Sequence, residues 1–235
     1  MVYVPAGKFL LGSTQEQVDT LHRQFPGDPP EWFTDELTQC RVSLLAYWMD
    51  KNPVTVAQYR KFCGVKGRDM PEAPDWGWQD SHPMTNVRWA DAAAYAKSAG
   101  KRLPTELEWE KAARGTDGRI YPWGNRWDAS KCANGTNSTN GTRPVETFHA
   151  GASPYGCLDM AGNVWQWCAE WYEEKAYERY AKGDLTPPTS GTHKVLRSTG
   201  WGNDDPRYFR CAARIGFVQD RRGGALGFRC ARGAE

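Results

Sequence analysis

The long stretch from residue 116 to residue 155 constrains the fold most, because it has almost no hydrophobic periodicity. Asn, Gly, Thr and Ser dominate it, so neither a helical nor a strand pattern fits. A loop of this length within a domain is usually functional or held by an ion. The chain also contains 24 Gly and 15 Pro, and its mean hydropathy is −0.73. We therefore expect a loop-rich α+β protein with modest regular structure.

The size and composition of the chain indicate one globular domain. Its 235 residues allow a sizeable core, and we see no internal repeat, low-complexity tract or linker. The formal net charge of +2 gives no electrostatic reason to expect nucleic acid as a partner. No apolar run approaches the ~18 residues of a membrane span. The first residues show no signal-peptide pattern.

Short helices and strands are predicted between the loops. Two capping boxes, in which Thr is followed three positions later by Gln or Glu, mark helix starts. An alanine-rich stretch closed by glycine marks a third helix. The Pro-rich stretch 13–40 predicts a loop, and short apolar runs between turn residues predict strands. The expected helices begin at Thr55, Ala90 and Thr105, the first ending at Gly64, and the expected strands lie within 2–12, 41–50, 162–172, 195–197, 210–213 and 226–230.

Common catalytic and metal-binding patterns are missing. The seven cysteines form no C-x-x-C or C-x-x-H pair, which disfavours zinc, and each is expected to be a small buried hydrophobic residue. The four histidines are scattered without metal-ligand spacing. No G-x-S-x-G, P-loop or G-x-G-x-x-G motif occurs.

Seven segments, in order along the chain, resemble the formylglycine-generating enzyme (sulfatase-modifying factor) family. Each alone is weak, but together they cover the chain nearly from end to end. The resemblance implies a single C-type-lectin-like domain over residues 1–235: an irregular, loop-rich α+β fold with a small twisted antiparallel sheet and two to three helices. The segments are Val4–Gly12, Asn86–Tyr95, Gly100–Trp109, Tyr121–Asn125, Gly156–Trp167, Arg210–Arg214 (R-C-A-A-R) and Leu226–Arg229 (L-G-F-R).

The catalytic part of that family's pattern is absent. In the family, a redox-active cysteine pair lies just upstream of the R-C-A-A-R equivalent, whereas residues 198–210 contain no cysteine. The resemblance therefore implies the scaffold without the oxidase chemistry, and we expect no copper. The nearest thiol, Cys211, occupies a position that is structural in the family.

Two family disulfides cannot form in this chain. Secreted members tie the equivalents of Cys211 and Cys230 to cysteines on two upstream helices. The matching positions are Ala96 and Ala113. This favours a reducing compartment, hence the cytoplasm or a particle made there, such as a phage.

The resemblance also implies a structural calcium site. Family members bind calcium within an N-x-x-G-N-x-W-E pattern, through two side chains and two carbonyls. In this chain the carboxylate has moved from the last position to the first, which calcium tolerates because it accepts varied oxygen ligands. The alternative is a turn held by hydrogen bonds without metal, and a second family site would begin at Asn134. The four expected ligands are Asp159, Gly162, Val164 and Gln166.

Residues 196–230 also resemble the variable segment of a second group with this fold, the variable proteins of diversity-generating retroelements. Those elements randomise NNY codons, which can encode most residues of this segment but not Trp201 or Gln219. Aromatic and arginine residues on exposed loops are typical of binding hot spots. The alternative is that Ile215 and Phe217 face the core. The candidate ligand-binding residues are Trp201, Asn203, Asp204, Asp205, Tyr208, Phe209, Ile215, Phe217, Val218, Asp220, Arg221 and Arg222.

Two classes of function follow. The favoured hypothesis is a non-enzymatic binding or display protein whose diversified C-terminal surface recognises a protein or another macromolecule. The alternative is a thiol oxidase of the formylglycine type, or a degenerate accessory sulfatase-modifying domain. A reactive thiolate would distinguish the two.

Overall fold

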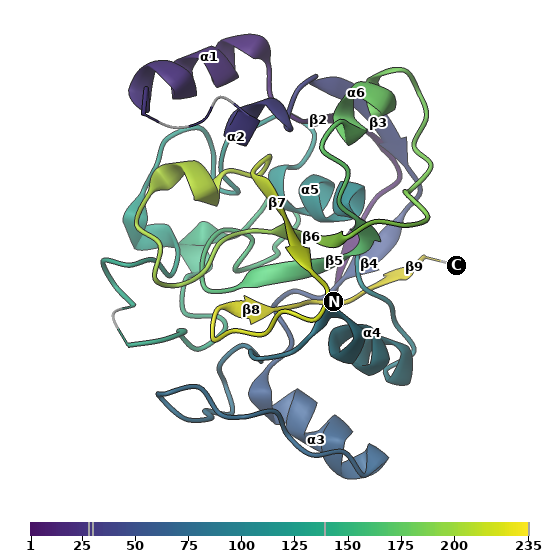
Figure 1. The fold of residues 1–235 in the computed structure, drawn as a ribbon, viewed down its shortest axis with the longest axis vertical. Helices are drawn as coiled ribbons and strands as arrows, with labels where there is room; N and C mark the ends of the chain where they lie inside the picture. Colours follow the sequence, from purple (N-terminus) through teal and green to yellow (C-terminus); the bar gives the residue numbers. More distant parts are fainter. Residues whose placement is uncertain (28, 30, 139, 235) are drawn as a thin grey trace.

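The computed structural model describes residues 1–27, 29, 31–138 and 140–234. A four-stranded sheet in the order β7-β6-β5-β8 lies at its centre (Figure 1). The pairs β5·β6 and β6·β7 are antiparallel, whereas β5·β8 is parallel, so the sheet is mixed. Its strands are β5 (Trp165–Trp171), β6 (His193–Arg197), β7 (Arg214–Val218) and β8 (Leu226–Gly227).

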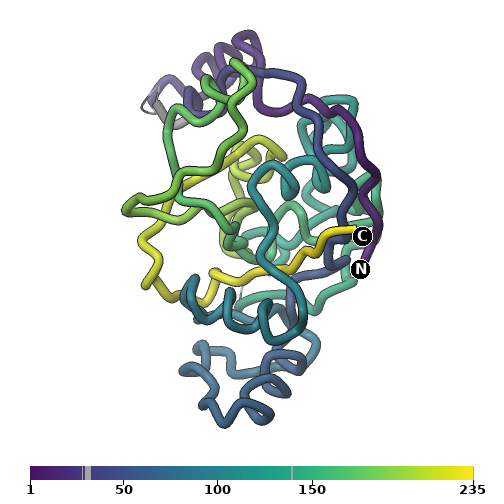
Figure 2. Tube along the Cα trace, turned by 90° about the vertical axis from the view of Figure 1, so that its right-hand side faces the viewer, coloured from purple at the N-terminus to yellow at the C-terminus, as the bar shows by residue number. Residues whose placement is uncertain are grey.

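Two smaller sheets bring distant parts of the chain together. One has the order β1-β4-β9, and the other pairs β2 with β3. Because β1 and β9 pair with opposite sides of β4, the two ends of the described chain lie close together (Figure 2). The strands are β1 (Val2–Val4), β2 (Gly7–Leu11), β3 (Cys40–Leu44), β4 (Tyr47–Met49) and β9 (Ala231–Gly233).

The three expected helices are present as α3 (Val56–Lys66), α4 (Trp89–Ser98) and α5 (Glu106–Arg114). Both predicted capping boxes are confirmed. The predicted end of α3 at Gly64 is wrong, because the helix continues to Gly67, which has the left-handed φ of 61°. A glycine within a helix costs only about 1 kcal/mol, so it need not end it.

Three further helices occur: α1 (Gln15–Gln24), α2 (Glu31–Thr34) and α6 (Ala176–Ala181). The first two contradict the predicted loop over 13–40. A capping box between Thr14 and Gln17 starts α1, so the sequence did carry a signal for it. Val18 and Leu21 of α1 then pack against Phe33 in a small cluster of their own.

The predicted strand at 210–213 is also wrong. The strand β7 begins at Arg214, and the preceding residues form a turn instead. Their main chain is occupied elsewhere, since Cys211 N donates to Ile120 O (2.7 Å) and Ala213 N donates to Arg210 O (3.1 Å).

The core forms between α5, the central sheet and the C-terminal strands. Ala113 shares one buried cluster with Cys211, and Ala96 shares another with Cys230. Ala96 and Ala113 are the two positions that the family resemblance implies for the missing disulfide partners, and all seven cysteines are free. Among the described residues, no helix is long and apolar enough to cross a membrane.

Candidate functional site

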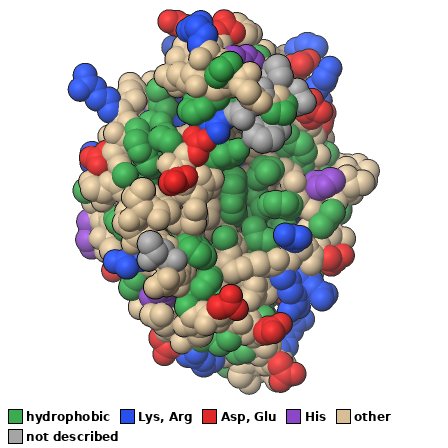
Figure 3. All heavy atoms as spheres, turned by 60° about the vertical axis from the view of Figure 1, so that its left-hand side comes forward, with side chains coloured by type: hydrophobic (Ala, Val, Ile, Leu, Met, Phe, Trp, Pro, Cys, Tyr) green, Lys and Arg blue, Asp and Glu red, His purple; other side chains and the backbone are tan. Residues whose placement is uncertain are grey.

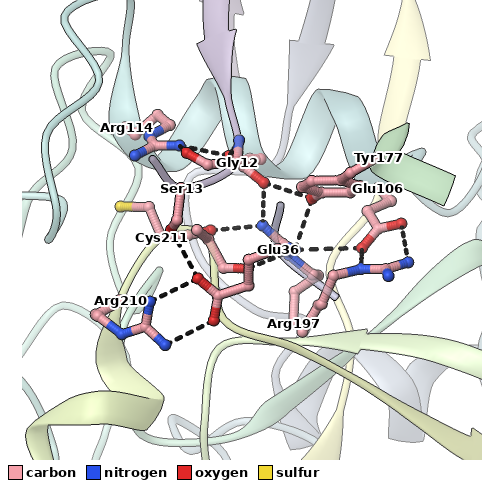
Figure 4. Close-up of polar contacts among 12 residues, drawn as sticks. Gly12, Ser13, Glu36, Glu106, Arg114, Tyr177, Arg197, Arg210 and Cys211 are labelled. Atoms are coloured by element: carbon pink, nitrogen blue, oxygen red, sulfur yellow. Dashed lines mark hydrogen bonds and ion pairs between the residues drawn. The ribbon is translucent and has the colours of Figure 1, made fainter. Parts of the chain in front are cut away.

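A buried network of charged side chains fixes β6 and the start of β7 to helix α5 (Figure 4). Arg197 Nη2 lies 2.6 Å from Glu110 Oε2, and Arg214 Nε lies 2.7 Å from Glu106 Oε1. Arg114 donates to the second oxygen of Glu110 at 2.7 Å. Burial acts to raise the pKa of Glu110, but Arg197 and Arg114 outweigh it and hold that pKa below its usual value. The carboxylate is therefore charged and paired inside the protein.

A second buried pair fixes the middle of the C-terminal segment. Arg210 donates through both terminal nitrogens to Glu36, each at 2.6 Å, and Ser13 Oγ donates to the same carboxylate at 2.8 Å. A two-point Arg–carboxylate contact of this kind fixes orientation as well as position. Both arginines of the R-C-A-A-R motif, Arg210 and Arg214, are thus structural.

An open cleft lies against this fixed framework. Its volume is about 480 Å³, and it is bordered by β5, β7, α2 and the 3-10 helix η3 (Pro206–Phe209). Figure 3 shows hydrophobic side chains gathered near the middle of one face of the molecule. Ligand sites in proteins are typically concave, mostly apolar and lined by a few polar groups. The lining comprises Phe33, Asp35, Glu36, Trp165, Tyr172, Glu174, Arg207, Tyr208, Arg210, Ala213, Arg214 and Ile215.

Asp35 is the unusual polar residue of the cleft. Burial raises its pKa to about 7, although Arg214 opposes the shift. Tyr172 donates to Oδ2 at 2.7 Å, whereas Oδ1 has no hydrogen-bond partner within the described part of the chain. The wall of the cleft therefore contains a buried carboxyl oxygen that no described group hydrogen-bonds.

The predicted ligand-binding residues separate into outward-facing and structural sets. Tyr208 and Ile215 line the cleft, but Ile215 and the half-buried Phe217 also pack against a buried core cluster, as the core-facing alternative describes. The rest of the outward set is exposed, with Val218 at 47%. Arg222 lies 3.5 Å from Asp91. The exposed residues are Asp204, Val218, Asp220, Arg221 and Arg222.

Three other candidates mainly support the loop. Asn203 Oδ1 accepts from Asp205 N at 2.9 Å, and Asp205 caps η3 through Arg207 N at 3.0 Å. Trp201 packs edge-on against Trp76 with ring centroids 5.3 Å apart. These side chains are half-buried, so they hold the loop in place and expose little surface to a ligand.

Phe209 requires a correction. It has no exposed surface and packs against Trp127 with ring centroids 4.7 Å apart. It also shares a buried cluster with Tyr121 and Cys132. Tyr208 and Phe209 are adjacent in η3, so their side chains point in different directions. Tyr208 faces the cleft and Phe209 points into the core. It cannot contact a ligand.

The expected calcium ligand Gln166 is already engaged. Its Oε1 accepts from Trp109 Nε1 at 2.9 Å and from Arg229 Nε at 2.7 Å. Its Nε2 donates to the carbonyl of Asp159 at 2.6 Å. Arg229, which is fully buried, is thus the cation that this side chain faces. Gln166 fixes the turn in the way that the metal-free alternative describes.

Asp159 suits a cation better. It is buried with φ 52°, and its Oδ2 has no hydrogen-bond partner among the described residues. Burial raises its pKa to about 6, while Arg229 acts to lower it. Gly162 O accepts from Ser198 Oγ at 3.2 Å and from Val164 N at 2.9 Å. Of the expected ligand set, the Asp159 carboxylate has an oxygen without a partner among the described residues, whereas Gln166 and the Gly162 carbonyl are engaged, so calcium at this turn stays a prediction.

The thiols are poorly suited to redox chemistry. The pKa of every cysteine is raised, in each case chiefly by burial, and that of Cys211 reaches about 12. A thiolate is the reactive form of cysteine, and a raised pKa disfavours it.

Sequence reasoning missed several residues of the cleft. Trp165 and Tyr172 lie within the stretch 162–172, which its alternating aromatic residues predict to be a strand, so a signal existed for them. Phe33 and Asp35 lie in the stretch that was predicted to be a loop, and no local pattern marks them. Their place in the cleft depends on contacts with β5, η3 and β7.

Comparisons with known proteins agree with this architecture. The sulfatase-modifying factor enzyme 1-like domain model matches residues 1–234. A formylglycine-generating enzyme of Streptomyces coelicolor is 38% identical over 66% of this chain and 54% of its own length. PvdO from Pseudomonas aeruginosa has a similar structure, with a TM-score of 0.79, 23% identity and coverage of 99% of this chain and 93% of that chain.

Another similar structure is Treponema denticola variable protein 1, with a TM-score of 0.74 and 23% identity, covering 98% of this chain and 94% of that chain. These two structural matches show the fold, which is confirmed as C-type-lectin-like α+β. The chain spans from 38% to 59% of the length of the first three curated relatives. The chain belongs to the sulfatase-modifying factor enzyme 1-like domain family.

Proposed function

We propose that the chain is a ligand-binding domain of the sulfatase-modifying factor type that carries out no thiol oxidation. It would hold a protein or another macromolecule on the outward side of residues 196–230. One observation carries the proposal: the side chains that fix this segment and those that face outward are different residues. Phe209, Arg210 and Arg214 are buried, and the two arginines reach the cleft only as ion-paired parts of its wall, whereas the half-buried Tyr208 and Ile215 border it.

This separation suits a surface that is diversified. Loop residues tolerate change when a rigid scaffold positions them. Replacing outward residues would alter recognition without loosening the buried ion pairs. The proposal therefore includes diversification of the segment by a retroelement, as in the variable proteins that it resembles.

The test is to sequence the genomic locus for a near-copy of codons 196–230 beside a reverse transcriptase gene. We expect such a copy, with differences at outward codons and none at 209–214. A copy that differs equally at both sets, or no copy, would contradict diversification. The outward codons are 204, 208, 215, 217, 218 and 220–222.

The oxidase alternative has its own test. The copper-loaded protein is incubated with a cysteine-containing peptide, and aldehyde formation is measured by mass spectrometry. We expect no aldehyde above the protein-free control. Formylglycine formation that Cys211→Ser abolishes would overturn the proposal, because Cys211 is the thiol nearest in the sequence to the position of the family's redox pair.

A further inference from the structure

Strand β7 forms an edge of the central sheet. It pairs with β6 from Arg214, opposite Arg197, to Val218, opposite His193. The sheet order ends at β7, so no described strand pairs with its other side. An unpaired edge presents main-chain donors and acceptors that can bind another extended chain.

The alternation of an antiparallel pair identifies which groups face outward. His193 O accepts from Tyr172 N on the β5 side at 2.7 Å. The next residue, Lys194, therefore directs its main chain toward β7, where it faces Phe217. It follows that the main-chain N–H and C=O of Phe217 point toward β6. Those of its neighbours Gly216 and Val218 then point away from β6.

Within the described residues, most of these outward groups have no partner. Val218 O accepts from Arg221 N at 3.0 Å, which agrees with its outward direction. Among the described residues, no hydrogen bond to a group outside the sheet is formed by Gly216 N, Gly216 O or Val218 N. A Cβ at Gly216 would meet the Tyr172 ring at 2.7 Å, so Tyr172 covers that face of the strand.

The open edge continues into the cleft. Ala213, Arg214 and Ile215 line the cleft at the start of β7, and Gly216 follows directly. A chain lying beside β7 would thus have its backbone at the edge and a side chain near Tyr208. Strand addition of this kind gains affinity from main-chain bonds and specificity from adjacent pockets.

We propose that the ligand is an extended polypeptide segment that adds to the sheet as a strand beside β7, bonding to Gly216 and Val218 and placing one side chain in the cleft. This inference rests on the proposed function and names its ligand class. An extended peptide fits because alternating, unpaired amide donors and carbonyl acceptors are matched by another polypeptide backbone.

The test begins with a phage-displayed library of linear peptides selected against the whole chain. Amide hydrogen exchange of the protein is then measured by NMR with and without the selected peptide. In the free protein, Gly216 and Val218 amides should exchange faster than those of Ile215 and Phe217. The peptide should slow exchange at Gly216 and Val218 by at least about tenfold, as expected for new hydrogen bonds.

A matched pair of variants tests the main-chain bond itself. Val218→Pro removes an outward N–H without removing a bond to β6, a position where edge strands tolerate proline. It should weaken peptide binding by about tenfold, whereas Val218→Ala should change it by less than about threefold. Unchanged melting temperatures would show that both variants fold. Equal binding by the two variants would overturn the proposal.

Other outcomes separate this inference from the proposed function. A peptide that shifts the signals of Tyr208 and Ile215 but leaves Gly216 unprotected would overturn strand addition and keep the binding surface. Failure of the library to yield a binder would overturn the peptide class, while the locus test still decides diversification. Protection of Gly216 that depends on protein concentration alone would identify a second copy of this chain as the occupant.

Discussion

Residues 209–214 and 215–222 are neighbours in the sequence but obey opposite physical constraints. In the first stretch, Phe209 has no exposed surface, and Arg210 and Arg214 are paired with acids inside the protein. In the second, Arg221 and Arg222 are exposed, and β7 has an open edge. Residue type alone does not separate these arginines. Their partners do, and the difference divides the segment into a scaffold and a surface.

The largest expected effect comes from breaking the scaffold at Arg197. Arg197→Ala should lower the free energy of unfolding by about 3–5 kcal/mol, because it leaves Glu106 and Glu110 as buried charges with fewer partners. Urea unfolding followed by tryptophan fluorescence measures the change. A loss below about 1 kcal/mol would show that this network does not hold the scaffold.

Two adjacent residues of η3, Tyr208 and Phe209, test the boundary between the surface and the buried scaffold. Phe209→Ala should destabilise the fold by about 3 kcal/mol, since it leaves a cavity beside Trp127. Tyr208→Ala should change stability by less than about 0.5 kcal/mol, as most surface substitutions do. Urea midpoints of the two variants provide the comparison. Similar losses in both would contradict the division at this step.

The calcium proposal concerns the turn that supports the scaffold. If Asp159 holds calcium, adding calcium at about 100 times its Kd should stabilise the protein by about 2.7 kcal/mol, and EDTA should remove that gain. Differential scanning calorimetry measures both, with Asp159→Asn as the matched control. Equal melting temperatures in calcium and in EDTA would show that Asp159 does not bind calcium.

The scaffold also predicts a pH dependence at Glu170. Burial raises its pKa from 4.5 to about 8, and repulsion from Glu106 adds to the shift. The folded protein therefore binds this proton more tightly than the unfolded chain does. The stabilisation is fully present below pH 4.5 and is lost as pH rises toward 8.

The measurement is the unfolding free energy of the wild-type protein and of Glu170→Gln between pH 5 and 8. The difference between the two profiles isolates Glu170 from other titrating groups such as Asp35. The wild-type protein should lose stability with rising pH more steeply than the variant. If the unfolding free energies of the two proteins change in parallel with pH, the folded protein does not hold a proton on Glu170 in this pH range.

The smallest effect is expected on the surface side. The double substitution of Arg221→Ala and Arg222→Ala should change stability by less than about 0.5 kcal/mol, because both side chains are exposed. Any larger loss in urea unfolding would show that the outward residues also carry the scaffold. That result would weaken the case for a surface that can vary freely.

Local patterns predicted much of the fold. Capping boxes located α3 and α5, and a third capping box at Thr14 could have located α1. Capping acts between residues three positions apart, so the sequence displays it directly. The family resemblance also identified Ala96 and Ala113 as the positions of the missing disulfide partners. The structure places Ala96 in a buried cluster with Cys230 and Ala113 in one with Cys211.

The candidate site was less predictable, because its members belong to distant elements. Arg210 pairs with Glu36 across 174 positions of the sequence, and no local pattern connects them. The same holds for Asp35, which reaches the cleft only because α2 packs near β7.

By itself, the sequence determined the order of the family segments, the helix starts and the lack of a cysteine between residues 198 and 210. Only the tertiary structure decided that Tyr208 faces the cleft while Phe209 is buried, and that β7 has a free edge. The physical reason is that capping and composition are local, whereas burial and strand pairing depend on which distant residues fill the remaining space.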